Sequence, residues 1–170
     1  DGEAKKIAIN KEVLKAGVES LPYELTEAQK RTLMEILEDL QKPFPMSRLV
    51  QGDVGSGKTV VAALAALNTV MEGHQVAIMA PTEILAKQHY QTFISTLKDF
   101  SLNIQFIAGS STKKQKEEVI RQMKTGTVDI MIGTHSLIQE GIGFKSLGLA
   151  IIDEQHRFGV KQREILKSYG

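Results

Sequence analysis

The chain has 170 residues, of which 42% are hydrophobic and 24% charged, and its formal net charge is +1. These values predict one globular domain with a sizeable core, and they exclude both a disordered chain and a membrane protein. The balanced charge means that any nucleic-acid surface must be local. The sequence contains no cysteine, which excludes disulfides and thiolate metal sites. The first residues lack an apolar signal core, so we expect a cytoplasmic protein.

Two helices are predicted before the first strand. Residues 1–20 form a charged, helical lead-in, residues 21–25 interrupt it, and a second helix runs from Thr26 to about Gln41. Thr26 and Gln29 have the spacing of a capping box, in which the Gln29 side chain reaches back to the Thr26 N–H. The Gln29 carboxamide also offers the donor and the acceptor that pair with an adenine edge. Both interpretations of Gln29 stay open at this point.

The rest of the chain alternates apolar runs with segments of helical spacing. The runs carry no polar alternation, which is typical of strands covered by helices on both sides. The predicted strands are residues 47–51, 76–80, 104–107, 130–132 and 149–152. The predicted helices between them are residues 60–71, residues 84–97 and a segment after Thr112. This order predicts an α/β fold with a doubly wound, mainly parallel sheet and helices on both faces, whose ligands gather at the carboxyl ends of the strands.

A phosphate-binding loop lies between the first predicted strand and the helix that follows it. Its eight residues are Gly52-Asp53-Val54-Gly55-Ser56-Gly57-Lys58-Thr59. The glycines let backbone N–H groups curl around phosphate oxygens at the positive end of the helix. Lys58 is placed to reach the β- and γ-phosphates, and the Thr59 hydroxyl is placed to bind Mg²⁺. The loop therefore predicts binding of a nucleoside triphosphate with Mg²⁺.

Two adjacent carboxylates follow the last predicted strand. Asp153 is placed to hold Mg²⁺ through its water shell, and Glu154 to orient and deprotonate the attacking water. A strand that ends in Asp-Glu is common in α/β proteins, and it is the phosphate loop upstream that favours the catalytic interpretation over a structural one. The pair argues against a small-molecule kinase, which does not need a hydrolytic glutamate. Glu154 and Lys58 are thus the predicted catalytic residues.

Five segments, in this order along the chain, carry a family resemblance. They are residues 21–29, 52–59, 80–89, 133–139 and 153–160. Together they resemble superfamily 2 helicases, and most closely the bacterial helicases that drive branch migration. The resemblance implies a RecA-like P-loop NTPase domain, ATP and Mg²⁺ as ligands, and adenine recognition by Gln29. It also implies a bacterial ATP-dependent DNA helicase that reverses replication forks and migrates Holliday junctions in recombination and repair.

The resemblance further implies a DNA surface that composition does not reveal. The implied DNA-contacting residues are Pro81, Thr82, Gly109, Ser110 and Thr134. Their hydroxyls and helix-start N–H groups suit sequence-independent contacts with phosphates. The alternative for each is a helix cap: Thr82 opens the helix from residue 83, and Thr112 with Gln115 forms another capping box. His156 is implied to link the nucleotide site to the DNA side.

The chain departs from the resembled family at both ends. Family members continue into a second motor domain whose arginines complete the ATP site, and a junction-binding wedge domain precedes the motor. We therefore expect residues 21–170 to form a C-terminally truncated ATP-binding domain, and residues 1–20 to come from an absent upstream domain. Such a fragment should be a monomer that hydrolyses ATP very slowly, because a second-lobe arginine contributes about 10³-fold or more in rate.

Two alternative functions stay open. The transcription-repair coupling factor has a similar motor. It typically carries Asp-Glu-Glu-His at the positions of residues 153–156, whereas this chain has Gln155 at the third of these positions. A nucleotide-dependent binding module without turnover is an alternative of another class. Glu154 argues against that module, since a protein that only binds the nucleotide does not need it.

Overall fold

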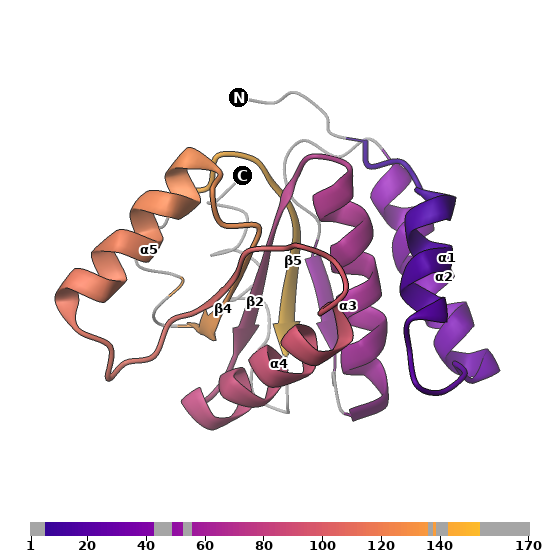
Figure 1. The fold of residues 1–170 in the computed structure, drawn as a ribbon, viewed down its shortest axis with the longest axis horizontal. Coiled ribbons are helices and arrows are strands. Elements are labelled where there is room, and N and C mark those ends of the chain that lie inside the picture. The colour runs from indigo at the N-terminus through magenta and orange to yellow at the C-terminus, as the bar shows by residue number, and fades with distance from the viewer. Residues whose placement is uncertain (1–5, 43–48, 53–55, 136–137, 139–142, 154–170) are drawn as a thin grey trace.

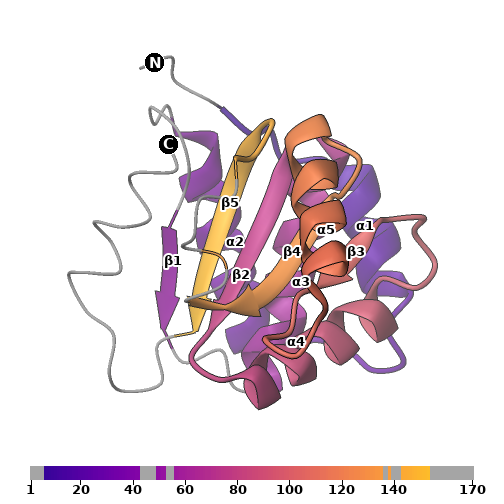
Figure 2. The ribbon, with the colours of Figure 1, turned by 90° about the vertical axis from the view of Figure 1, so that its left-hand side faces the viewer.

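A five-stranded parallel sheet forms the centre of the computed structural model, which describes residues 6–42, 49–52, 56–135, 138 and 143–153. The strands lie in the order β1-β5-β2-β4-β3. Their bounds are β1 Leu49–Gly52, β2 Gln75–Ala80, β3 Ile104–Phe106, β4 Ile130–Thr134 and β5 Leu147–Asp153. Figure 2 shows β1, β5, β2 and β4 side by side in this order. β5, the last of the described strands in the sequence, thus lies between β1 and β2.

Within the described ranges, five helices with defined bounds separate or precede these strands (Figure 1). Their bounds are α1 Lys11–Glu19, α2 Glu27–Gln41, α3 Ser56–Met71, α4 Glu83–Thr96 and α5 Lys113–Thr125. The alternation of strand and helix from β1 to β4 confirms the predicted α/β fold with a parallel, doubly wound sheet. None of the described helices has both the length and the apolar character needed to cross a bilayer.

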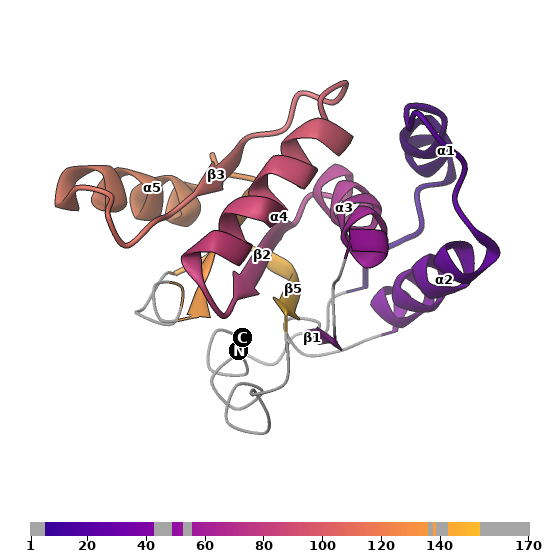
Figure 3. The same ribbon diagram turned by 90° about the horizontal axis from the view of Figure 1, so that it is seen from below.

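The two faces of the sheet carry two separate apolar cores. Along β2, Val76, Ile78 and Ala80 belong to the core under α1–α4, whereas Ala77 and Met79 belong to the core under α5. Side chains of a strand point alternately to its two faces, so a strand buried on both sides reads as one continuous apolar run. Figure 3 shows α1–α4 gathered along one side of the sheet. The expectation of helices on both faces is therefore confirmed.

The helix that follows the phosphate loop is the most deeply buried one. The small residues Ala63, Ala65 and Ala66 of α3 have no exposed surface. On its outer side, α1 approaches so closely that a Cβ added at Gly17 would lie 2.9 Å from Leu67 Cδ2. Small side chains let two helix axes come near each other, because no bulky group separates the backbones. Neighbouring elements thus surround α3.

The lead-in segment is helical over Lys11–Glu19, as predicted, and shares the core of the residues that follow it. Ile7 is 2% exposed, and its N–H donates to the Leu40 carbonyl at 3.0 Å. The Asn68 side chain of α3 accepts a hydrogen bond from the Asn10 N–H at 2.7 Å. The domain boundary at residue 20 stays a prediction, but residues on both sides of it pack together.

Three predicted helix starts are confirmed. Both capping boxes are present, one made by Thr26 with Gln29 and one by Thr112 with Gln115. Thr82 caps α4, where its Oγ1 accepts a hydrogen bond from the Leu85 N–H at 3.2 Å. Each cap satisfies an N–H group that the first helical turn cannot satisfy by itself. The polar residues that begin these helices therefore have a structural role, whatever further role they have.

The strand pairing brings the predicted motifs to one edge of the sheet. Gly52 of β1 pairs with Asp153 of β5, and Ala80 of β2 pairs with Thr134 of β4. All four residues are the last of their strands. The arrowheads in Figure 1 accordingly point to the same edge. This edge is where a doubly wound sheet binds its ligands.

Candidate functional site

The phosphate loop connects β1 to the N-terminus of α3. β1 ends at Gly52 and α3 begins at Ser56, while the predicted loop residues Asp53, Val54 and Gly55 lie outside the described residues. The strand-loop-helix order that the motif requires is therefore present. The first turn of α3 supplies backbone N–H groups and the positive end of the helix dipole, both of which favour a phosphate.

Two side chains of the first turns of α3 differ in exposure. Lys58 is exposed, so its ammonium group is available to a ligand at the surface. Thr59, the next residue, is 5% exposed. This arrangement suits the predicted roles, since a lysine must reach outward to the β- and γ-phosphates whereas a magnesium-binding hydroxyl lies closer to the sheet.

Gln29 makes a contact that sequence reasoning missed. Its Oε1 accepts from the Thr26 N–H at 2.8 Å, which is the capping bond, and its Nε2 donates to the Gly57 carbonyl at 2.8 Å. The carboxamide therefore ties the start of α2 to the first turn of α3. A carboxamide has two N–H donors and two acceptor lone pairs, so one of each is left for a ligand. Adenine recognition by Gln29 stays a prediction.

Asp153 is the buried acidic group of the site. Its exposed fraction is 0%, and its Oδ2 lies 2.8 Å from Nε2 of His89, a residue of α4. Its Oδ1 makes no hydrogen bond within the described part of the chain. The predicted catalytic Glu154 and the predicted coupling residue His156 lie outside the described residues.

The residues at this edge fit a hydrated magnesium ion. A buried carboxylate oxygen without a partner is costly unless a ligand or water satisfies it. Asp153 Oδ1 is such an oxygen, and it belongs to a residue that pairs with the start of the phosphate loop. Mg²⁺ favours oxygen ligands, keeps several waters, and is held in proteins by one or two carboxylates together with substrate phosphates. Thr59 and Asp153 supply the donor types that such a site needs.

A second histidine lies against Asp153. His135 follows β4 directly and is 7% exposed. Burial lowers the pKa of His135, and this effect outweighs the opposing influence of the nearby Asp153 backbone and of the Asp153 charge. The imidazole is therefore favoured in its neutral form. Asp153 thus has one histidine from α4 at its side chain and one from the end of β4 at its backbone.

The candidate DNA-contacting segments are connected to one another. Glu83, the first residue of α4, accepts a hydrogen bond from the Gly109 N–H at 2.8 Å through Oε1. Lys116 Nζ of α5 donates to the Gly109 carbonyl at 3.1 Å. Thr82 and Ser110 are both exposed. The structure therefore holds the segment before α4 and the segment after β3 together, with their hydroxyl-bearing residues at the surface.

The remaining candidates adjoin the same edge. Pro81 follows β2, and Thr134 is the last residue of β4 and pairs with Ala80. Both are half-buried. Ile84, on the first turn of α4, is a large apolar side chain that is 73% exposed.

A cavity of about 530 Å³ lies at a different place in the fold, between β3 and α5. Gln105, Phe106 and Lys114 are among its lining residues. β3 is an edge strand of the sheet, and β4 and β2 separate it from β5, so this cavity is distant from Asp153.

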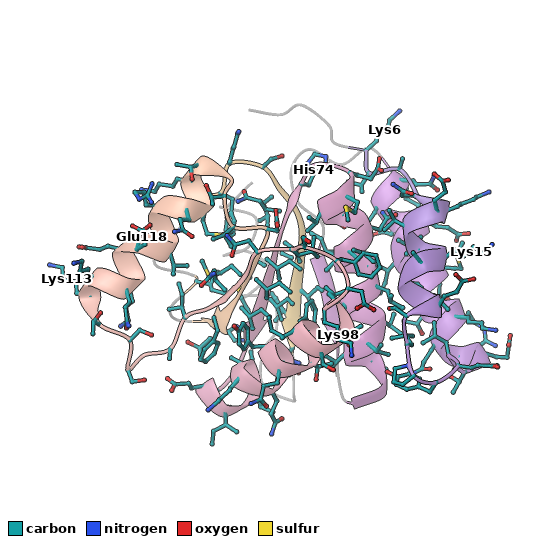
Figure 4. All side chains as sticks on the ribbon, in the orientation of Figure 1. Lys6, Lys15, His74, Lys98, Lys113 and Glu118 are labelled. Atoms are coloured by element: carbon teal, nitrogen blue, oxygen red, sulfur yellow. The ribbon has the colours of Figure 1, made fainter. Side chains whose placement is uncertain are left out.

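Figure 4 shows Lys113 at one end of α5 and Glu118 farther along it. Hydrogen bonds with Arg121 and then Gln122 lower the pKa of the exposed Glu118 carboxyl, so this part of α5 is a solvated, ion-paired face.

Comparisons with known proteins cover nearly the whole chain. Residues 26–169 match the family model described as DEAD/DEAH box helicase. The ATP-dependent DNA helicase RecG of Aquifex aeolicus is 51% identical over 168 residues, which are 99% of this chain and 21% of that protein. A structure of RecG bound to a three-way DNA junction matches with a TM-score of 0.80 and 46% identity, over 92% of this chain and 22% of the other.

A more distant structure shows the fold alone. The UvsW helicase of bacteriophage T4 matches with a TM-score of 0.67 and 19% identity, over 97% of this chain and 57% of the other. The RecA-like helicase fold that the motifs implied is thereby confirmed. This chain spans about a fifth of the length of the RecG proteins it matches.

Proposed function

Since this chain belongs to the DEAD/DEAH box helicase family, we propose that it is the ATP-binding first motor lobe of a bacterial DNA helicase of the RecG type. The whole protein would remodel branched DNA, by fork reversal and by branch migration of Holliday junctions, in recombination and repair. Its partners would be duplex and branched DNA, a second motor lobe and a junction-binding wedge domain. We place it in the cytoplasm, as a monomer.

One observation carries the proposal. Gly52 and Asp153 are paired residues at the ends of two neighbouring parallel strands. The pairing puts the start of the phosphate loop beside a fully buried carboxylate that has one oxygen without a hydrogen bond among the described residues. A loop for phosphates and an acidic group for their metal ion are the two parts that a nucleotide hydrolase must bring together.

The site residues then have distinct roles. Lys58 and the backbone N–H groups of residues 52–58 bind the phosphates, and Gln29 contacts the adenine. Thr59 and Asp153 hold the hydrated Mg²⁺, with Asp153 acting through water. When bound, the ion neutralises charge that develops on the phosphate oxygens. Glu154, immediately after Asp153 in the sequence, orients the attacking water and accepts its proton.

DNA binds along the adjoining surface. Thr82, Ser110 and Thr134 contact phosphates of one strand through their hydroxyls, together with the backbone at Pro81 and Gly109. Contacts of this kind position the protein without reading sequence, and they suit a motor that moves along any duplex. His156, from the segment after Asp153, links the nucleotide site to this surface. Closing and reopening of the cleft between the two lobes then moves the DNA.

The proposal is tested with Glu154→Gln and Lys58→Ala in the full-length protein. Loss of a general base costs about 10²- to 10⁴-fold in rate, so E154Q should bind ATP and lose turnover. K58A should lose ATP binding itself. Both variants should fail to unwind a three-way DNA junction that the parent unwinds.

The alternatives give different results in the same assays. Turnover that survives in E154Q would make the hydrolytic assignment wrong. A parent protein that binds ATP but never hydrolyses it, with or without DNA, would be a nucleotide-dependent binding module. A parent that displaces a stalled RNA polymerase and ignores three-way junctions would be a coupling factor, although Gln155 and the 51% identity to a RecG protein favour the present proposal.

A further inference from the structure

We infer that His89 is a positioning residue that orients Asp153 toward the nucleotide-bound metal ion and links this carboxylate to the helix that begins at Thr82. The inference rests on the proposed function of the ATP site. It concerns a residue that lies outside the phosphate loop and is not adjacent to either predicted catalytic carboxylate in the sequence.

The contact between the two side chains is buried and direct. His89 Nε2 lies 2.8 Å from Asp153 Oδ2, and the two side chains are 7% and 0% exposed. A buried polar group needs a hydrogen-bond partner, and such a bond in a dry environment also fixes the rotamer of both side chains. Because His89 occupies Oδ2, the oxygen that can face a ligand is Oδ1, which has no partner among the described residues. The bond therefore selects which carboxylate oxygen serves the metal site.

The position of His89 in the fold gives this bond a second consequence. His89 is seven residues after Thr82, which caps α4, so the two lie about 10 Å apart along the helix axis. The start of α4 is also tied to the Gly109 segment through Glu83. Ala86, His89 and Phe93 form the buried stripe of the helix. A displacement of the start of α4 by DNA would move this stripe with it, and His89 would move Asp153.

A purely structural role for His89 makes a different prediction. If the ring only fills space or satisfies a buried carboxylate, its replacement would destabilise the fold without changing how magnesium contributes to ATP binding. The two roles can be separated by replacing His89 with side chains of different length. Glutamine can place its amide nitrogen near the position of His Nε2, whereas asparagine is one methylene shorter and places its amide nearer to the position of Nδ1.

The experiment compares His89→Gln, His89→Asn and His89→Phe in the full-length protein. Phenylalanine keeps a ring and makes no hydrogen bond. The first readout is equilibrium binding of a fluorescent ATP analogue with Mg²⁺ and with EDTA, which isolates the contribution of the metal ion. We expect the tightening by Mg²⁺ to stay within twofold of the parent in H89Q and to fall at least fivefold in H89N and H89F. Binding in EDTA should stay unchanged in all three.

The second readout is the effect of DNA on the affinity for Mg²⁺-ATP. We expect this effect to persist in H89Q and to be reduced in H89N and H89F, while the affinity for DNA in the absence of nucleotide stays the same. A melting curve accompanies each variant.

Each other result decides against the inference. A parent-like contribution of Mg²⁺ in H89N or H89F overturns the positioning role, as does equal loss in all three variants. If H89N and H89F fail to fold whereas H89Q folds, His89 serves stability alone, and the inference is also overturned. If the parent itself shows no Mg²⁺-dependent binding of ATP, the proposed function is what has failed.

Discussion

The Gln29 carboxamide offers the sharpest test of the nucleotide site, because its two ends have separate partners. Oε1 accepts from the Thr26 N–H and Nε2 donates to the Gly57 carbonyl. Gln29→Glu keeps the acceptor and removes both donors. The capping box is therefore retained, and a carboxylate in the first turn of a helix is favourable. The bond to Gly57 is lost from the folded protein, so the free energy of unfolding should fall by about 0.5–1.5 kcal/mol.

The expected loss in ATP binding follows from the bonds removed. A neutral hydrogen bond contributes about 0.5–1.5 kcal/mol net, and Q29E lacks the proposed donor to adenine. This loss weakens ATP binding by roughly 2- to 12-fold. The bond to Gly57 is already present without a nucleotide, so it acts on binding only through the position of the first turn of α3. The bond to Gly57 affects any nucleotide, whereas the bond to adenine affects ATP alone. The preference for ATP over GTP should therefore fall as well.

Calorimetric titration of ATP and GTP into the full-length protein measures both quantities, and denaturant unfolding checks the fold. Gln29→Leu serves as the matched control, because it removes the capping bond together with both donors and should also destabilise the protein. An ATP affinity in Q29E equal to that of the parent would show that Gln29 is a helix cap and nothing more. If Q29E weakens the binding of ATP and GTP equally, the contact with Gly57 alone explains the loss, and adenine recognition is refuted.

Two further predictions concern the packing of β5 and the hydrogen bond between Glu83 and Gly109. Gly148→Ala should lower the free energy of unfolding by about 1–3 kcal/mol. The reason is that an added Cβ would lie 2.6 Å from His74 Cβ and 2.9 Å from Ile7 Cδ1. A melting temperature lowered by less than about 2 °C would contradict this close packing. Glu83→Ala should weaken DNA binding several-fold and leave ATP binding unchanged, because it releases the Gly109 segment from α4. Glu83→Gln keeps an acceptor oxygen and should bind DNA like the parent, as measured by fluorescence anisotropy; equal binding by E83A would show that the link has no part in DNA contact.

The sequence predicted the elements of the fold better than their arrangement. The strands β2, β4 and β5 were recognisable because an apolar run buried on both faces lacks alternation, and the predicted run 149–152 lies inside Leu147–Asp153. The order of the strands was not predictable, because periodicity describes each strand singly and carries no information about its neighbours. The insertion of β5 between β1 and β2 is the step that pairs Gly52 with Asp153, and it appears only in three dimensions.

In the candidate site, too, local motifs were predictable from the sequence whereas a contact between distant residues was not. The phosphate loop and Asp153 were predicted because their residue types occur in a short motif or at a strand end. The contact between His89 and Asp153 was missed because 64 residues separate them. A local signal was nevertheless present: His89 falls in the apolar stripe with Ala86 and Phe93, and a histidine on the buried face of a helix must find a polar partner there.

The two helices that begin at the ligand edge, α3 and α4, differ in burial, and this difference bears on which of them is free to move. α3 is enclosed by the sheet and by α1, α2 and α4, and residues such as Ala63 and Ala66 have no exposed surface. A helix that is packed on all sides resists displacement, because every shift would open a void or force a clash. α4 instead has an open outer face, with Ile84 and Ile94 exposed. We therefore expect movement between the proposed ATP and DNA sites to pass through α4, whose hydrogen bonds at this edge, among the described residues, include His89 to Asp153 and Glu83 to Gly109.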